Sequence, residues 1–535
     1  MLQRLGGFLA LSLTLVAMTA GVASPSKINH ALNEQGTSVD EEEEDVLIID
    51  DDEDPPSKRS ERTSPSNNAL FIGKYQSLLG VDTSFDGAQE DIIEWRNRLD
   101  ISISMDVTPN LRVVASGRMK YWLLLEDSKE SDDFRADTQR AIFEGSLRDT
   151  YALWHLGSGY DLALGYRTFT WGRTDFSQPL DVLNPLDFRE GMLDQGATNK
   201  EPIFSIEASK SFGDLNVSLV WIPFFAPHKI DLFGTDWSMI EADLPAMKSG
   251  SFANYLGILD ALHPTRYEEL QGVLTSTQDP PQDGFTGADA GLRLTGNAGG
   301  VDLGFAYAYQ WDRMPVIHNL DFAGMQVGFT GILGTGNKAA NLEQIRRSVD
   351  LGYERRHVIG SDFEWTAGAF TFKGDVAYSH PRTFYIETEK PIEGDLDGNT
   401  ELSIESIRKP SVAWAFQVDV MPGAGLFLSV ELGGNHVFSL EEDVKLLLLE
   451  RDLYRLSALI QWRFGAQDDF RFQIAGMMGL TQDDGLLMPQ FTWRISPLWS
   501  LDIGATLAFG SKEAPSPISL FDTNDFAYVR ANLSF

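Results

Sequence analysis

A regular alternation of polar and apolar residues is the feature that most limits what this chain can fold into. Between residues 94 and 107 the even positions are polar and the odd positions are apolar, with Asn97 as the one exception. Successive side chains of a β-strand point to opposite faces, so this segment predicts a strand with one polar and one apolar face. The turn Thr108-Pro109-Asn110 follows, and residues 111–121 repeat the alternation with Val114 as the exception. The two runs predict a β-hairpin.

The pattern recurs to the end of the chain, and this repetition decides between two kinds of all-β fold. In a soluble sandwich, the apolar face of a hairpin would pack on a second sheet. Runs of about ten alternating residues separated by turns are instead typical of transmembrane barrels, which are apolar toward lipid and polar toward a wet interior. We therefore predict an all-β fold, a transmembrane antiparallel β-barrel over residues 69–535, surrounded by outer-membrane lipid.

Composition supports this prediction and excludes other classes. Hydrophobic residues make up 43% of the chain while the mean hydropathy is -0.17, so the apolar residues are dispersed among polar ones. Beyond the N-terminal residues, no apolar stretch reaches the about 20 residues that a spanning helix needs. The net charge of -35, with no basic cluster, excludes nucleic acid as a partner. The absence of cysteine excludes disulfides and thiolate metal sites, and no cofactor is expected.

Short turns between the runs set the expected number of strands. Eight turns join sixteen strands, and an opening strand near 69–84 and a closing strand at 525–535 bring the number to about eighteen, with sixteen as the alternative. An even number places both chain ends on one side, which we assign to the periplasm. The turns are Thr108-Pro109-Asn110, Gly157-Ser158-Gly159, Gly213-Asp214, Ala298-Gly299-Gly300, Phe372-Lys373-Gly374, Pro422-Gly423-Ala424-Gly425, residues 465–469 and Pro497-Leu498. The expected extracellular loops are residues 126–139, 171–201, 225–284, 313–350, 387–404, 439–451 and 511–524.

Two N-terminal segments precede the predicted barrel. Arg4, the apolar residues 8–18 and the small residues Gly21-Val22-Ala23 predict a secretory signal peptide at residues 1–23 rather than a membrane anchor. Residues 24–68 predict a disordered acidic periplasmic arm, because residues 40–54 read DEEEEDVLIIDDDED. The arm is either a solvated tail or a docking peptide whose residues 46–49 add as a strand to a periplasmic protein. Binding of the isolated 24–68 peptide that is lost on Ile48→Asp would support docking.

The closing strand carries a terminal signal. Leu533, Ala531, Val529 and Ala527 form an apolar face that points outward, and Phe535 ends the chain. A terminal aromatic on such a strand resembles the recognition signal of proteins inserted by the barrel-assembly machinery of Gram-negative outer membranes. Phe535 is therefore the predicted assembly signal, and that machinery is an expected partner. The last strand must also pair with the first, so that no backbone edge is left in hydrocarbon.

Residues 168–190 contain the most specific motif. The chain reads TFTWGRTD at 168–175 and DVLNPLDFRE at 181–190. This resembles the outer-membrane family known as domain of unknown function 1302, in which a strand and an arginine precede WG and then DVLNPLDxRE. The segments WIPFF at 221–225 and 352–386 are also similar, so the resemblance covers residues 140–225 well and the rest of 69–535 thinly. It implies a porin-like barrel of Gram-negative bacteria, often encoded near transport genes for lipids or other hydrophobic compounds. The acidic arm and the long 225–284 segment depart from the family pattern.

The motif also has a physical interpretation. Asp181, Asn184 and Asp187 lie at three-residue spacing around Pro185, a combination that favours caps and turns. Such a stiff polar loop either folds into the pore as a constriction or packs on neighbouring loops outside it. Arg173 and Arg189 are candidate partners for the acidic residues. The predicted constriction-loop residues are Trp171, Gly172, Arg173, Asp175, Asp181, Asn184, Pro185, Asp187 and Arg189.

Alternation also places a set of cations inside the barrel. A basic inner wall would favour anions or acidic head groups. The alternative is that these cations pair with Glu94, Asp100, Asp106 and loop carboxylates. The predicted lumen and selectivity residues are Arg96, Arg98, Arg112, Arg118, Lys120, Arg167, Arg455, Arg463, Arg471, Arg494 and Arg530.

Two other loops have open interpretations. Leu256, Leu259 and Leu262 lie at roughly helical spacing within residues 251–271, which predicts a helix that either plugs the pore or lies over its mouth. Residues 393–399 (EGDLDGN) have closely spaced oxygens like a calcium loop. The EF-hand pattern nevertheless has Ser406 in place of its closing glutamate, so a turn is favoured.

These patterns predict a porin-like channel or transporter for a small hydrophobic or amphipathic solute. A surface-binding or structural barrel without transport is the alternative. A barrel enzyme such as a lipase is disfavoured, because it needs a nucleophile with a histidine at the rim. The chain has eight histidines but neither a G-x-S-x-G nor an H-E-x-x-H motif.

Overall fold

The computed structural model describes part of the unit Glu61–Phe535. The described residues are 69–83, 92–124, 140–189, 199–230, 281, 284, 287–320, 327–328, 331, 338–391, 400–442, 444–447, 449–510, 516–521 and 525–535. The predicted signal peptide (1–23), acidic arm (24–68), helix at 251–271 and loop at 393–399 all lie outside these residues.

Strands make up nearly all of the regular structure. The alternating, β-branched and aromatic-rich runs of the sequence coincide with them, because such residues suit a pleated surface with two different faces. The strands are β1 (Ala69–Asp82), β2 (Ile92–Thr108), β3 (Leu111–Leu124), β4 (Arg140–Leu147), β5 (Thr150–Gly157), β6 (Tyr160–Arg167), β7 (Ile203–Phe212), β8 (Leu215–Ile222), β9 (Asp289–Ala298), β10 (Val301–Trp311), β11 (Val316–Leu320), β12 (Val349–Gly352), β13 (Arg355–Ala367), β14 (Phe370–Pro391), β15 (Thr400–Gly423), β16 (Leu426–Val437), β17 (Asp452–Phe464), β18 (Phe470–Gly479), β19 (Asp484–Ser496), β20 (Trp499–Gly510) and β21 (Phe526–Ser534). The helices whose two ends both lie in the described part of the chain are α5 (Lys338–Ser348) and the 3-10 helix η6 (Ser519–Phe521).

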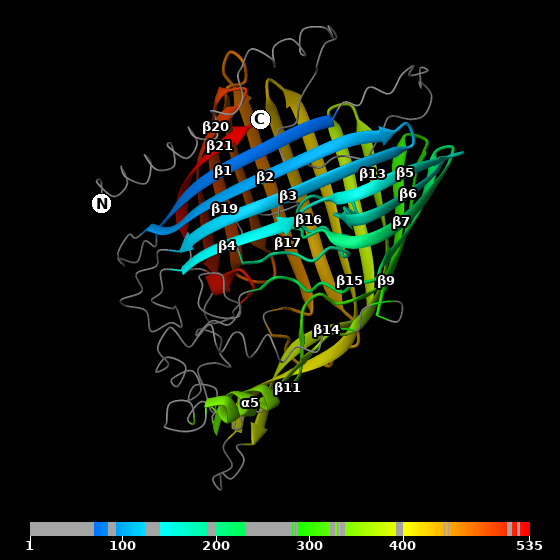
Figure 1. The fold of residues 1–535 in the computed structure, drawn as a ribbon. Coiled ribbons are helices and arrows are strands. Elements are labelled where there is room, and N and C mark those ends of the chain that lie inside the picture. The colour runs from blue at the N-terminus through cyan, green and yellow to red at the C-terminus, as the bar shows by residue number, and fades with distance from the viewer. Residues whose placement is uncertain are drawn as a thin grey trace. The chain divides into compact units, whose positions relative to one another are not determined.

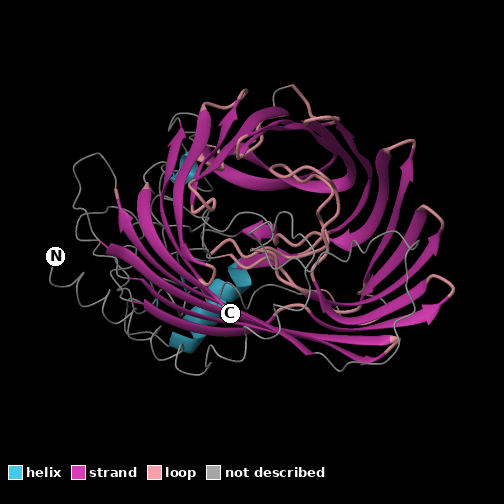
Figure 2. Ribbon diagram, turned by 90° about the horizontal axis from the view of Figure 1, so that it is seen from above, coloured by secondary structure: helices cyan, strands magenta, loops and turns pink. Residues whose placement is uncertain are grey.

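All strands except β11 and β12 belong to one antiparallel sheet that closes on itself (Figure 1). The first and last strands pair, with Lys74 opposite Ser534 and Asp82 opposite Phe526. β4 and β5 both pair with β3, so they form a single crossing that is interrupted at Arg148-Asp149. The result is a closed barrel of 18 strands, seen as a ring in Figure 2, and the predicted number of eighteen is confirmed.

One end of the barrel carries the short turns. All but one of the predicted turns join consecutive strands there. The exception is Phe372-Lys373-Gly374, which lies within β14, and this prediction was wrong. The turn is at Gly368-Ala369, where Gly368 has a φ of 65°. A Cβ on Gly374 would lie 2.3 Å from the ring of Phe363, so this glycine makes room for an aromatic side chain and does not turn the chain.

The other end carries the long connections. There β14 and β15 remain paired from Arg382 opposite Lys409 to Pro391 opposite Thr400. Residues 387–391 and 400–404, which we expected in a loop, are therefore strand, because the β-prone run at 383–388 (TFYIET) continues the pairing beyond the barrel wall. β11 pairs with β12 in a separate two-stranded sheet, and α5 leads directly into β12.

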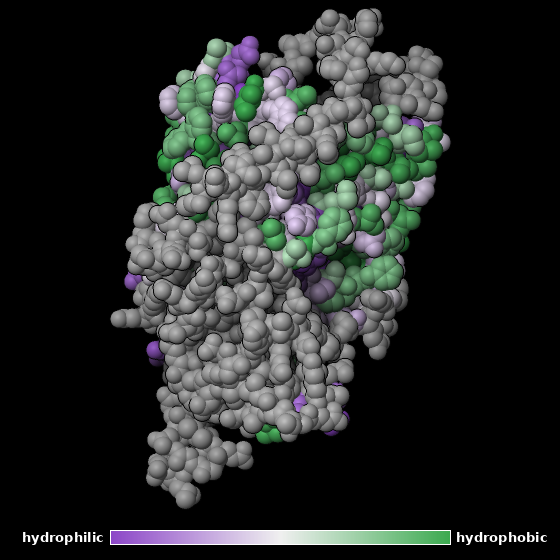
Figure 3. Space-filling model, turned by 60° about the vertical axis from the view of Figure 1, so that its left-hand side comes forward, coloured by the Kyte–Doolittle hydropathy of each residue, from purple (hydrophilic) through white to green (hydrophobic). Residues whose placement is uncertain are grey.

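The outer and inner faces of the barrel differ as the alternation requires. Outward side chains are large and apolar: Ile103 is 42% exposed, Val430 49% and Ile503 51%. Part of this apolar outer surface is visible in Figure 3. Inward positions on the same strands carry Ser102, Glu431 and Asp502, all of them buried. A continuous apolar exterior around a polar interior matches a barrel that lies in hydrocarbon. No helix among the described residues has the length and apolar character needed to cross a membrane.

Candidate functional site

Residues 168–189, which we call the inward segment, follow β6 and lie inside the barrel, where Figure 2 shows loop segments within the ring of strands. Five consecutive backbone N–H groups of this segment donate to side chains of the inner wall. Arg173 and Thr174 donate to Asp375 of β14 at 2.9 and 3.3 Å. Asp175 donates to Gln417 of β15 at 2.8 Å. Phe176 and Ser177 donate to Glu431 of β16 at 3.0 and 2.8 Å. The segment is thus bound across three neighbouring strands through its backbone.

Glycine in the motif allows this close approach. Gly172 has a φ of 101°, a backbone conformation that residues other than glycine rarely adopt. A Cβ there would also lie 2.5 Å from the Asp375 carboxylate. The hydroxyl of Thr174 donates a further bond of 2.7 Å to the same carboxylate. The sequence Gly-Arg-Thr therefore presents backbone donors to Asp375 without steric conflict.

The wall is shaped to receive the segment. Gly291 of β9 faces Trp171, and a Cβ at this glycine would lie 2.7 Å from the indole ring. Likewise, a Cβ on Gly433 of β16 would lie 2.4 Å from the hydroxyl of Ser177. We call the inner faces of β9, β10 and β13–β16 the docking wall. Its small residues leave room for the larger side chains of the segment.

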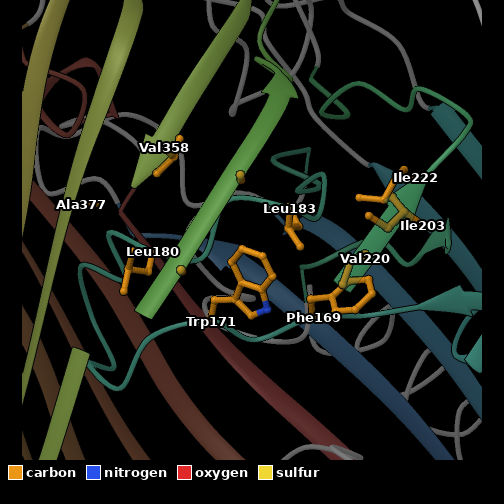
Figure 4. Close-up of a cluster of buried hydrophobic side chains, with 11 residues drawn as sticks. Phe169, Trp171, Leu180, Leu183, Ile203, Val220, Ile222, Val358 and Ala377 are labelled. Atoms are coloured by element: carbon orange, nitrogen blue, oxygen red, sulfur yellow. The ribbon is translucent and has the colours of Figure 1, made fainter. Parts of the chain in front are cut away.

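A buried apolar cluster completes the contact (Figure 4). Trp171, Leu180 and Leu183 of the inward segment are 6%, 1% and 1% exposed. Burial of such side chains stabilises the contact by about 1.5–3 kcal/mol each. The docking wall contributes mostly small side chains to the cluster, and β7 and β8 contribute larger ones. The cluster consists of Phe169, Trp171, Leu180, Leu183, Ile203, Val220, Ile222, Ala306, Ala308, Val358 and Ala377.

Asn184 fixes the base of the inward segment. Its side-chain oxygen accepts the N–H of Phe169 at 2.7 Å. Its amide donates to the carbonyls of Arg167 and Glu201 at 3.2 and 2.9 Å, so one buried side chain joins the end of β6 to the residues before β7. Pro185 adds a second link, because its carbonyl accepts the N–H of Glu201 at 2.8 Å.

The acidic residues of the motif have separate partners. Asp181 pairs with Lys200 inside the barrel, and burial raises the pKa of the Asp181 carboxyl. Asp187 pairs with Arg189 at 2.7 Å and lies 3.5 Å from Lys120 of β3. These contacts bind the far end of the inward segment to a different part of the wall.

Arg173 and Asp175 also contact the docking wall. We expected Arg173 to pair with the aspartates of the motif, and this prediction was wrong. Arg173 instead lies 3.4 Å from Asp362 and 3.5 Å from Glu364 of β13. Asp175 accepts the Lys373 ammonium of β14 at 3.0 Å and is half exposed. Arg189 reaches the wall as well, 2.8 Å from Glu144 of β4, so every predicted residue of the motif lies in, or directly beside, the contact with the barrel interior.

The predicted lumen cations all lie at inward positions of their strands. Most have a carboxylate partner at close range. The pairs are Arg96–Glu94 at 2.9 Å, Arg98–Asp100 at 3.1 Å, Arg112–Asp106 at 3.0 Å, Arg118–Asp100 at 2.6 Å, Lys120–Asp187 at 3.5 Å, Arg455–Asp484 at 3.4 Å, Arg530–Asp502 at 2.8 Å, and Arg167–Glu207. Arg463, Arg471 and Arg494 lie near one another on β17–β19. We call the inner faces of β17–β21 and β1–β3 the arginine wall.

Three residues that hold the inward segment were not singled out from the sequence. They are Asp375, Gln417 and Glu431, which alternation places inside the barrel but which look like ordinary lumen residues. A usable signal exists, since small residues such as Ala377 and Gly433 lie at the next inward position of the same strand. A hydrogen-bond acceptor beside a small residue on the inner face of a strand indicates a place where the backbone of another segment can approach the barrel wall.

The terminal aromatic takes part in the closure of the barrel. Phe535 exchanges two backbone hydrogen bonds with Gly73, at 2.7 and 2.8 Å. Its ring lies 6.1 Å from that of Phe71 and covers Gly73, where a Cβ would approach it to 2.3 Å. Among the described residues, no group of histidine and acidic side chains is arranged to hold a metal ion.

Comparison with known proteins gives a family match and several distant structures. The sequence model of the family described as "Protein of unknown function (DUF1302)" matches residues 48–535. No curated protein sequence matches the chain.

Several solved structures are similar in fold. Acinetobacter baumannii OccAB3 is similar with a TM-score of 0.43 at 8% identity, covering 88% of this chain and 99% of that one. Pseudomonas aeruginosa OpdK has a TM-score of 0.42 at 10% identity, covering 88% and 98%. Salmonella typhi OmpF, in complex with daunomycin, has a TM-score of 0.37 at 8% identity, with the same coverage. Likeness at this level carries no argument about function.

Proposed function

The chain belongs to the DUF1302 family, and from this premise we propose that it is an outer-membrane channel that passes a small amphipathic solute. The observation that carries the proposal is the inward segment, which is bound to the docking wall through five consecutive backbone N–H groups. A barrel that served only as an anchor has no need of an ordered constriction in its interior. A selective pore does, because it must be narrow enough for the solute to contact both sides.

The accessible wall of this passage carries two kinds of chemistry. Trp171 and Leu183 are buried between the inward segment and the docking wall, so a solute meets the arginine wall instead. There the guanidinium groups of Arg463 and Arg471 lie on the same inner face as Leu459. A solute with an apolar body and a negative group suits such a surface. This combination supports an amphipathic solute rather than a simple ion.

Orientation follows from loop length. Short turns of outer-membrane barrels face the periplasm and long loops face the exterior. The short turns and both ends of the barrel domain, Ala69 and Phe535, lie at the same end. We propose that this end is periplasmic.

Planar-bilayer recording of the refolded full chain tests the proposal. We expect small, stable conductance steps, because the inward segment lies inside the barrel and narrows the pore (Figure 2). The control is a second variant, Asp375→Ala/Glu431→Ala, which removes the wall acceptors of the segment. Silence of both proteins, each shown by gel heat-modifiability to be folded, would overturn the channel proposal.

A surface-binding barrel is the second candidate. It is favoured by the long-loop end, where β14 and β15 continue beyond the barrel wall and β11, β12 and α5 add further ordered structure. Strands that project from the rim can present a binding surface without any transport. Folded but silent protein in the bilayer experiment would favour this candidate.

A further inference from the structure

The inner face of β17–β19 carries rows of side chains whose character changes along the barrel. Each row lies across the three strands, because paired residues of neighbouring strands share a face. Arg463 is opposite Arg471, Gln461 is opposite Gln473, and Leu459 is opposite Ala475. All of these side chains except Ala475 are half-buried, so they are accessible, whereas Gln417 and Glu431 on the docking wall are 0% exposed.

The row nearest the short turns is cationic. Arg463 and Arg471 are directly opposed on neighbouring strands, and two like charges in this position repel one another and favour an anion beside them. Among the described residues, Arg463 forms no ion pair. Arg471 donates to the hydroxyl of Thr492 at 3.4 Å. Two adjacent guanidinium groups offer a planar set of donors that fits a carboxylate or phosphate.

The next row is made of amides. Gln473 is opposite both Gln461 and Gln490. Gln490 donates to Thr492 at 3.1 Å and accepts the hydroxyl of Tyr528 at the same distance. Side-chain amides both donate and accept, so they can complete the solvation of a polar head group without adding charge.

The third row is apolar and flexible. Met488 is opposite Ala475, and Met477 is opposite Leu486 one inward position further on. Leu486 packs with Ala508 and Ile518, and both methionines border that cluster. Methionine adapts to varied apolar shapes because its side chain is unbranched and polarizable. Four residues of strand, about 13 Å, separate the arginine row from the Leu459 row.

We propose that this face binds an aliphatic carboxylate of about twelve carbons, with the carboxylate between Arg463 and Arg471 and the alkyl chain extending the about 13 Å to Leu459 and Met488. The inference rests on the proposed channel, since it names the class of solute that the channel passes. The order of charge, amide and apolar surface also sets the orientation, with the head toward the short-turn end. A neutral amphiphile lacks the group that the arginine row recognises, and a short acid lacks the chain.

Equilibrium binding of radiolabelled dodecanoate to the refolded full chain in detergent tests the inference. Uptake by the micelles is measured in protein-free detergent and subtracted from the values for both proteins. We expect Arg463→Gln/Arg471→Gln to bind dodecanoate at least tenfold more weakly than wild type. Unlabelled carboxylates should compete with increasing strength from octanoate to dodecanoate, by about fourfold for each methylene that contacts the apolar row. Dodecanol should not compete.

A matched control separates this site from a general loss of charge. Arg112→Gln/Arg118→Gln removes the same two charges from β3, on another part of the arginine wall. Its affinity for dodecanoate should stay within twofold of wild type. Met488→Gln should weaken dodecanoate binding but leave competition by octanoate unchanged.

The binding experiment and the conductance experiment can fail independently. Equal dodecanoate affinity in wild type and in the folded Arg463→Gln/Arg471→Gln variant would overturn the inference while leaving the channel proposal intact. Equal competition by dodecanol and unlabelled dodecanoate would overturn it as well. A silent bilayer with tight, arginine-dependent dodecanoate binding would instead reject the channel and retain the site.

Discussion

The docking wall and the arginine wall belong to the same sheet and follow the same alternation, yet their inner faces are built differently. The docking wall has buried acceptors, Asp375 and Glu431, beside small residues such as Gly291 and Ala377. The arginine wall has long side chains that lie half-buried over the interior. The difference teaches that side-chain size at inward positions decides where a chain segment can dock. The charge of the inward side chains then decides whether the backbone N–H groups of that segment are attracted or repelled.

The strongest test of the comparison removes the acceptors of the docking wall. Asp375 and Glu431 together accept four backbone N–H groups, and hydrogen bonds to charged groups contribute about 1.5–3 kcal/mol each. In Asp375→Ala/Glu431→Ala we expect the inward segment to leave the wall and the single-channel conductance to rise several-fold. The control is Asp502→Ala, which removes a carboxylate partner of Arg530 on the arginine wall. If it raised the conductance equally, the two walls would not differ as described.

A bulky side chain on the docking wall should have a smaller effect. Gly291→Leu places atoms where the indole ring of Trp171 now lies, 2.7 Å from the Cβ position. We expect the segment to shift locally and the conductance to rise by less than twofold. Trp171→Ala in the same protein should restore a docked segment, which limited proteolysis within residues 168–189 can report. Identical protease sensitivity in wild type and Gly291→Leu would contradict the proposed fit.

Selectivity should depend on the other wall. Replacing Arg112, Arg118 and Lys120 with glutamine removes three cations from β3. We expect the reversal potential to shift by several millivolts toward the value of a cation-selective pore. The change is modest because each of these side chains already lies close to a carboxylate. As a comparison, Arg293→Gln changes a cation of the docking wall that pairs with Asp362, and it should leave the potential unchanged. An unmoved potential in the triple variant would show that the arginine wall does not face the ion path.

The smallest effect concerns acidity at the base of the inward segment. Burial lowers the pKa of His228 to about 3, and its neutral Nδ1 accepts the N–H of Leu186 at 2.7 Å. In a released segment this pKa returns to about 6.5. Because the docked pKa is the lower one, docking is fully stable above pH 6.5 and weakens as the pH falls below it.

Between pH 7 and pH 5 the docked state should lose about 2 kcal/mol. Brief openings should become more frequent, with little change in mean conductance. His228→Asn keeps an acceptor but does not titrate, so its openings should be independent of pH over this range. Openings of equal frequency in wild type at both pH values would show that His228 does not control docking.

Much of the barrel could be predicted from the sequence, because lipid on one side and polar contents on the other impose a two-residue period that is visible without any tertiary contact. The misplaced turn at Phe372-Lys373-Gly374 shows the limit of local signals. Gly374 looks like a turn residue, but its role is to lie beneath the ring of Phe363 on a neighbouring strand. A glycine selected for space and a glycine selected for conformation are identical in sequence.

The site was less predictable than the barrel. The motif at 168–190 indicated a stiff loop, but the sequence left open whether it lies in the pore or outside it. Its position depends on Asp375, Gln417 and Glu431, which are at least 200 residues away along the chain. The partner of Arg173 was mispredicted for the same reason, since Asp362 is 189 positions away. The alternation of polar and apolar residues predicts on which face of the barrel a side chain lies. It does not predict which residues that side chain contacts across the interior.

Closure of the ring by β1 and β21 has a kinetic consequence. Gln76 and Asn532 bond at 2.8 Å although they are 456 positions apart in the chain. Joining ends so distant carries an entropic cost that grows with the logarithm of the intervening length, and folds dominated by such distant contacts form slowly. The last nine-residue strand must be synthesised and delivered before the first can be fully paired. Until then both edges are open to any other strand. The time before closure is therefore the period when this chain most needs protection from aggregation.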